Sequence, residues 1–169
     1  TKEQAKLKTE WIDDFEHGSF TASNKEELSY WLYMPQDAEN VPLMVWEHGG
    51  GEVLDSSYEG ANLDKNKGAV TWMQHGKETA VLSVQYPTNY SFGISEKTEE
   101  WEQMCAYNDA KYELIQELIE NGQIDENRIY ISGASSGGGG VLSFVTQYPD
   151  LFAAALPICA KDVIVPMSE

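Results

Sequence analysis

The feature that most constrains this chain is the stretch from Arg128 to Gly140, RIYISGASSGGGG. It opens with β-branched and aromatic residues, which are typical of a buried strand. Gly-x-Ser-x-Gly follows at residues 133–137, and an apolar segment at helical spacing comes directly after it. A strand, a sharp turn and a helix in this order, with Ser135 at the turn, are the context in which Gly-x-Ser-x-Gly has a functional meaning.

The position of Ser135 predicts a nucleophile. A tight strand-to-helix turn forces this residue into an unfavourable backbone conformation, which the small neighbours Gly133 and Gly137 permit. The hydroxyl then projects above the end of the sheet, and the backbone N–H of Ser136 points into the same space. The alternative is a glycine-rich turn whose serines only cap the helix. A phosphate-binding loop is disfavoured because no Lys-Ser or Lys-Thr follows the glycines.

A second glycine motif, far upstream, supports a catalytic interpretation. The apolar run at residues 43–46 is typical of a strand buried on both faces, and it leads directly into EHGGG at residues 47–51. Three consecutive glycines allow backbone N–H groups to approach a ligand closely. We expect the N–H groups of Gly50 or Gly51, with that of Ser136, to form an oxyanion hole for acyl transfer. The alternative is a flexible loop that binds nothing.

The remaining chain alternates between predicted strands and helices. Continuous apolar strands separated by helices predict an α/β fold with a parallel sheet covered on both faces. The length suffices for one core, so we predict a single domain over residues 1–169 with an N-terminal arm at about 1–17. The further elements that we expect are a hairpin at 19–22 and 28–34, a helix at 68–74, a strand at 79–86, a helix at 95–121 capped by Gly122, and a strand at 153–158.

The charge of the chain excludes some classes of partner. Acidic residues number 28 against 11 basic ones, for a net charge of -17, and they are spread along the whole chain. Such a surface repels phosphate backbones and anionic lipids, so we expect neither nucleic acid nor membrane as a partner. No apolar stretch approaches the roughly 20 residues of a membrane span.

Two cysteines, Cys105 and Cys159, lie 54 positions apart without Cys-x-x-Cys spacing. This pattern predicts no zinc or iron–sulfur site, so we expect no metal. Both cysteines fall in apolar contexts, which predicts buried free thiols, with a disulfide as the alternative in a secreted protein. The chain begins at Thr1 rather than Met, so an export signal could have been removed. The compartment stays open, with a secreted protein favoured.

The motifs, their order and their separation resemble those of the α/β-hydrolases. The chain is similar to bacterial esterases related to feruloyl and acetyl-xylan esterases and to polyhydroxyalkanoate depolymerases. This resemblance implies a three-layer sandwich with a mostly parallel sheet, and a cofactor-free serine hydrolase acting on small-molecule or polysaccharide-linked esters. The blocks that carry it are WEHGGGE at 46–52, NKGAV at 66–70, RIYISGASSGG at 128–138 and YPDLFAA at 148–154.

The chain departs from the resemblance in its triad, which in this fold runs in the order serine, acid, histidine. His17, His48 and His75 all precede Ser135, and the 34 residues after that serine contain no histidine. We therefore expect the general base to come from a missing segment or from another chain, and His48 to brace the glycine loop. Asp162 resembles the acid of the family but comes earlier than the family places it, so it is either the acid or an accidental match.

The predicted sheet also differs from that of the family in its extent. The resemblance implies further strands after residues 153–158, so we expect an open sheet edge there and an incomplete C-terminal part of the domain. Two other functions stay open. One is a serine peptidase of the prolyl-oligopeptidase type, which shares the fold and the serine turn. The other is a hydrolase-like binding module without chemistry, which the missing histidine suggests.

Overall fold

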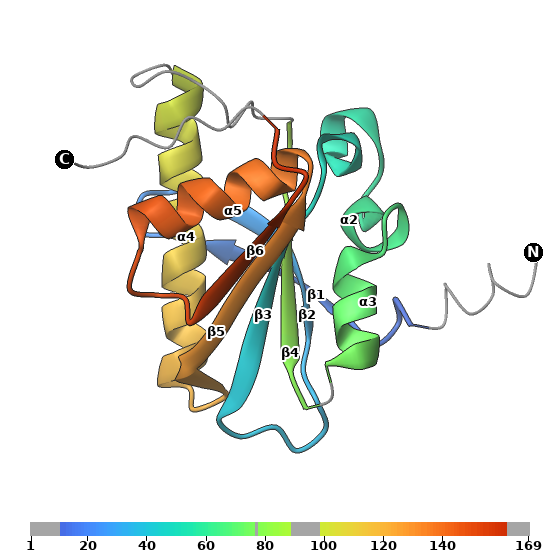
Figure 1. Ribbon diagram of the computed structural model, residues 1–169, viewed down its shortest axis with the longest axis vertical. Coiled ribbons are helices and arrows are strands. Elements are labelled where there is room, and N and C mark those ends of the chain that lie inside the picture. Colours follow the sequence, from blue (N-terminus) through green and yellow to red (C-terminus); the bar gives the residue numbers. More distant parts are fainter. Residues whose placement is uncertain (1–10, 77, 89–98, 162–169) are drawn as a thin grey trace, which may run out of the picture.

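The computed structural model describes residues 11–76, 78–88 and 99–161 (Figure 1). In this part of the chain six strands form one sheet, in the order β1-β2-β4-β3-β5-β6. The four strands from β4 to β6 in that order run parallel, and the hairpin β1–β2 adds to β4 antiparallel. The strands are β1 Glu16–Thr21, β2 Glu27–Tyr33, β3 Val41–Glu47, β4 Ala80–Gln85, β5 Ile124–Ala134 and β6 Ala154–Ile158.

Helices cover both faces of the sheet, which gives the three layers expected (Figure 1). The helices α4 (Glu99–Glu120) and α5 (Ser136–Gln147) lie on one face. The shorter α2 (Ala61–Asp64) and α3 (Gly68–His75) lie on the other. Two 3-10 turns, Gly50–Glu52 and Leu54–Ser56, follow β3. The expected α/β fold with a mostly parallel sheet is confirmed.

The position of strand β3 explains its continuous apolar sequence. Its side chains alternate between two cores: Leu43 and Val45 pack in the core beneath α4 and α5, whereas Met44 and Trp46 pack in the core beneath α3. All four are buried. Because successive side chains on a strand point to opposite faces, a central strand covered on both sides has no polar face.

Helix α4 ends where the sequence predicts. Gly122 follows it with a φ of +74°, a left-handed conformation that glycine adopts without a Cβ penalty. The first four residues of the helix expected over 95–121 lie outside the described residues. The sequence predicts an apolar core stripe on this helix, made of Trp101, Met104, Cys105, Tyr112, Ile115, Leu118 and Ile119. Met104, Ile115 and Leu118 are buried, and the other four are partly buried.

Strand β6 contrasts with the buried centre of the sheet. Among the described strands it pairs only with β5, and Leu156 and Ile158 expose 53% and 39% of their surface. An apolar groove of about 360 Å³ runs along this edge, between Leu156 and side chains such as Met44 and Trp72. The open edge expected after residues 153–158 is therefore present in the described part of the chain.

The prediction of two buried thiols is wrong. Cys105 is only half-buried in α4, and Cys159 is exposed; both are free. Cys159 directly follows β6, which is the edge strand of the sheet among the described residues. Within residues 11–76, 78–88 and 99–161, no helix is long and apolar enough to span a membrane, and no cluster of side chains is suited to a metal ion.

Candidate active site

Ser135 occupies the junction between β5 and α5. Its φ of 58° and ψ of −119° lie outside the conformations that ordinary residues favour, so the backbone is strained at this point. Its N–H donates to the Ile158 carbonyl at 3.0 Å, and its carbonyl accepts from Lys161 N–H at 3.2 Å. The end of β6 thus holds the strained turn in place. The turn predicted at Ser135 is confirmed.

The glycines on either side of Ser135 are required by close packing against β3. A Cβ on Gly133 would lie 2.6 Å from the Cβ of Glu47, and a Cβ on Gly137 would lie 2.1 Å from the Glu47 carbonyl oxygen. Both distances are far below van der Waals contact. The turn that carries Ser135 therefore rests directly on the backbone at the end of β3.

The glycine loop after β3 is ordered by its own hydrogen bonds. Gly49 N–H donates to Glu52 Oε2 at 2.6 Å, and the Gly49 carbonyl accepts from Glu52 N–H at 3.1 Å. A peptide is planar and trans, so fixing the Gly49 carbonyl directs the N–H of Gly50 the opposite way. Within the described part of the chain, no hydrogen bond occupies the N–H groups of Gly50, Gly51 or Ser136.

His48 braces this loop, as predicted, and is unsuited to act as a base. Its Nδ1 donates to the Gly49 carbonyl at 2.8 Å, and its Nε2 accepts from Tyr86 N–H at 3.0 Å. This pattern requires the neutral imidazole protonated on Nδ1. Burial lowers the pKa of His48 below its usual range, although the Gly49 hydrogen bond opposes the shift. Both ring nitrogens are therefore committed to structure.

The other triad candidates lie elsewhere. His17 on β1 stacks on Trp31 with ring centroids 4.4 Å apart, and its Nε2 contacts Ser29 Oγ at 2.9 Å. His75 is the last residue of α3. Among the described residues, none of the three imidazoles hydrogen-bonds to Ser135, and Asp162 lies outside that part of the chain.

The sequence predicts an acidic loop at residues 53–66 that contains Tyr58 and Asn62 and is well placed to line a pocket above the glycines. It also predicts a loop at 88–94 whose aromatic residues either touch a substrate or anchor the loop to the surface. Asn62, expected to line a pocket above the glycines, is fully buried and donates to Ser83 Oγ at 2.9 Å, so that prediction is wrong. It lies in α2, which turns the side chain towards β4. Tyr58 is exposed and donates to Asp64 Oδ2 at 2.6 Å. Tyr90 and Phe92, considered as substrate contacts, lie outside the described residues.

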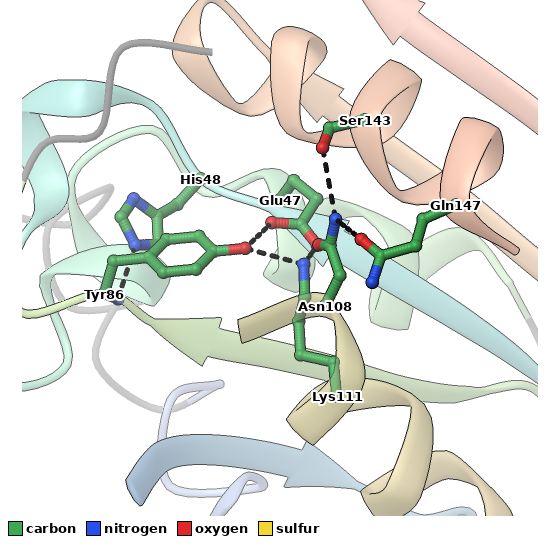
Figure 2. Close-up of polar contacts among 7 residues, drawn as sticks. All are labelled: Glu47, His48, Tyr86, Asn108, Lys111, Ser143 and Gln147. Carbon is green, nitrogen blue, oxygen red and sulfur yellow. Dashed lines mark hydrogen bonds and ion pairs between the residues drawn. The ribbon is translucent and has the colours of Figure 1, made fainter. Parts of the chain in front are cut away.

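A buried polar cluster beside the site was missed by sequence reasoning (Figure 2). Lys111 of α4 is fully buried, and its Nζ donates to Glu47 Oε1 at 2.5 Å and to Tyr86 Oη at 2.7 Å. Tyr86 Oη donates in turn to Glu47 Oε2 at 2.5 Å. Burial lowers the pKa of Lys111, although the ion pair with Glu47 opposes the shift. One feature of the sequence could have predicted this burial. Lys111 lies seven residues from both Met104 and Leu118, which places it on the apolar stripe of the helix.

The chain is similar to several known proteins. A family model described as the prolyl oligopeptidase family matches residues 92–161. Gut esterase 1 of Caenorhabditis elegans is 28% identical over 148 residues, which are 84% of this chain and 25% of that protein. Dipeptidyl aminopeptidase BIII of Pseudoxanthomonas mexicana is 30% identical over 156 residues, 85% of this chain and 20% of that protein. A solved structure of a thermostable esterase superposes with a TM-score of 0.71 at 33% identity, covering 88% of this chain and 41% of that one.

The layered sheet, the strained serine turn and these likenesses define a class: the chain has the α/β-hydrolase fold. It spans a fifth to a quarter of the length of the two curated relatives described above. These similar proteins carry the names of esterases and of a peptidase. At this level the chain is similar to serine hydrolases of the esterase and prolyl-oligopeptidase type.

Proposed function

We propose that this chain carries the nucleophile and the oxyanion hole of a serine esterase, with Ser135 as the nucleophile. The observation that carries this proposal is the backbone of Ser135, strained at φ 58° and ψ −119°. Beside it lies a glycine loop in which the N–H groups of Gly50 and Gly51 make no hydrogen bond to any described residue. Strain of this kind persists only where the surrounding structure imposes it, and it clusters at active sites.

The proposed reaction follows from these positions. Ser135 Oγ attacks the ester carbonyl, and a histidine supplied from outside these 169 residues takes its proton. The N–H groups of Ser136 and of Gly50 or Gly51 donate to the tetrahedral oxyanion, and each such donor contributes on the order of 3 kcal/mol to transition-state stabilisation. The histidine then gives this proton to the leaving oxygen as the C–O bond breaks, so a neutral alcohol departs and an acyl-Ser135 remains. Water hydrolyses that ester to the carboxylic acid and the free serine.

We further propose that Asp162 orients that histidine, and that the substrates are carboxylic esters, either small molecules or esters linked to polysaccharide. The names of gut esterase 1 and of the thermostable esterase support ester cleavage as the reaction class. The polysaccharide-linked ester rests on the resemblance to feruloyl and acetyl-xylan esterases. No cofactor takes part in this chemistry.

A serine peptidase is the second candidate, because the prolyl oligopeptidase family model matches residues 92–161. Both reactions use the same acyl-enzyme, so the serine turn does not separate them. Comparison of p-nitrophenyl acetate with a proline-containing peptide does. Faster turnover of the peptide than of any ester would reverse the ranking of the two candidates.

The test uses the protein expressed from its complete gene and p-nitrophenyl acetate as the substrate. Ser135→Ala is expected to abolish turnover above the residual level that the oxyanion hole alone supports. Ser136→Ala is the matched control, because it removes a hydroxyl one residue away and keeps the backbone N–H. Equal activity of the wild type and folded Ser135→Ala would contradict the proposal, and a folded wild type without activity would favour a binding module.

A further inference from the structure

We propose that Glu47, Lys111 and Tyr86 form a positioning cluster that holds the serine turn and the glycine loop in register with each other. This inference rests on the proposed function, because it concerns the alignment of the two halves of the oxyanion hole. The cluster lies where the ends of β3 and β4 meet α4 (Figure 2).

The ammonium group of Lys111 contacts several neighbouring side chains. Two of its three donors have oxygen partners, on Glu47 and Tyr86. The ring of Phe144 lies 4.4 Å from Nζ, within the range of a cation–π contact. Phe144 belongs to α5, so one buried charge contacts side chains from β3, from the end of β4 and from α5.

Glu47 connects the cluster to the serine turn. It is the last residue of β3 and lies opposite Gly133 in the parallel ladder. Its carbonyl oxygen is the atom nearest to the place of a Cβ on Gly137. The ion pair with Lys111 holds the Glu47 side chain, and the same residue supplies the backbone on which the Ser135 turn rests.

Tyr86 connects the cluster to the glycine loop. Its phenol is held by Lys111 and Glu47, and its backbone N–H donates to His48 Nε2 at 3.0 Å. His48 in turn donates to the carbonyl of Gly49, in the peptide whose N–H belongs to Gly50. Hydrogen bonds through Lys111, Tyr86 and His48 thus connect the buried ammonium group to the peptide that carries a proposed oxyanion donor.

A positioning role explains this cluster better than a stabilising one. Removing two charges from water costs several kcal/mol per ion, and buried ion pairs are often replaceable by apolar residues at no loss of stability. The same replacement would remove the directed hydrogen bonds from Lys111 to Glu47 and Tyr86. Geometry is therefore the property that the cluster supplies and an apolar core does not.

The test compares the wild type of the complete gene product with the double variant Glu47→Gln, Lys111→Met. The double variant avoids an uncompensated buried carboxylate, and its folding is checked by circular dichroism. Misalignment of one oxyanion donor is expected to lower kcat for p-nitrophenyl acetate by about 10- to 100-fold, towards the loss known for deleting a donor. KM is expected to stay within about twofold, because the loss falls on the transition state.

Asn108→Leu is the matched control. Asn108 lies one turn before Lys111 in α4, is equally buried, and donates to Ser143 Oγ at 3.1 Å and Gln147 Oε1 at 3.0 Å on α5 (Figure 2). Its variant removes buried hydrogen bonds between α4 and α5 and keeps Glu47, Lys111 and Tyr86 unchanged. We expect its kcat to stay within about twofold of the wild type, whatever its melting temperature.

Three outcomes would overturn the inference. One is a folded double variant with wild-type kcat, and another is an equal loss of kcat in the double variant and Asn108→Leu. If the double variant does not fold, Tyr86→Phe decides, because it removes only the phenol oxygen; an unchanged kcat then contradicts the cluster. In each case the proposed function is tested separately: it is still supported if the wild type is active and Ser135→Ala is not.

Discussion

The carbonyl oxygen of Glu47 lies 2.1 Å from the position that a Cβ on Gly137 would take. This contact joins the end of β3 to the first turn of α5, between the two glycine motifs of the sequence. It explains why Gly-x-Ser-x-Gly ends in glycine here. The motif meets a spatial requirement of the neighbouring strand as well as the needs of the turn itself.

Gly137→Ala is therefore expected to destabilise the protein by roughly 2–3 kcal/mol, because the Glu47 backbone must move. In a helix free of this contact, the same change would stabilise by up to about 1 kcal/mol. Urea denaturation measures the difference. Gly51→Ala is the control, since a Cβ there meets nothing within 4 Å. Equal stability of the two variants would contradict the packing described for the serine turn.

The strain at Ser135 predicts that a glycine at this position would make the protein more stable at the expense of its activity. Ser135→Gly relieves the positive φ of 58° and is expected to be about 1 kcal/mol more stable than Ser135→Ala, which keeps the Cβ. Both variants are expected to be inactive. Thermal unfolding of the two variants side by side checks the order, and a less stable glycine variant would argue against strain at this residue.

The buried imidazole of His48 predicts an acid-sensitive fold. Because burial lowers its pKa, the unfolded chain binds more protons than the folded one below the ordinary value of 6.5. The free energy of unfolding should be highest above that pH. It should then fall by up to about 1.4 kcal/mol per pH unit, until the folded-state pKa is reached.

Urea denaturation between pH 7.5 and 5.5 measures this effect, and His48→Asn is the comparison. Asparagine offers an N–H for the Gly49 carbonyl but does not titrate. The variant is expected to show a shallower fall in stability over this range. Identical slopes for both proteins would exclude His48 as the source.

The sequence predicted best the features in which the backbone conformation depends on residues close together in the chain. A strand, glycines and a serine at fixed offsets predicted the turn at Ser135, and three glycines after an apolar strand predicted the loop at Gly49. Periodicity placed α4 and its core stripe, because a helix repeats every 3.6 residues and an apolar face must be buried. Each of these features depends on residues that are neighbours in the sequence.

The missed features depend on contacts between distant residues. Lys111 and Glu47 are 64 positions apart, and nothing local to either shows that they meet in the core. Charged residues are rarely fully buried, so propensity assigns both to the surface. The prediction for Cys159 was wrong in the opposite direction: its apolar neighbours suggested burial, but the residue is exposed after β6, the edge strand of the sheet among the described residues.

The 169 residues alone are expected to be nearly inert toward esters. A serine hydroxyl needs an adjacent base at neutral pH, and the three histidines of this chain make no hydrogen bond to Ser135 among the described residues. Only residual acceleration of about 10³–10⁴-fold over water should remain. Assay of this chain against the complete gene product measures the difference, and equal rates would show that the base lies within these residues.

The central claim is that Ser135 is an activated nucleophile, and covalent labelling tests it most directly. The folded complete gene product is treated with a fluorophosphonate, digested, and sequenced by mass spectrometry. Our account predicts one adduct, on Ser135, in the wild type and in Ser136→Ala, and no adduct in Ser135→Ala. An unlabelled wild-type protein, or an adduct on any other residue, would contradict it.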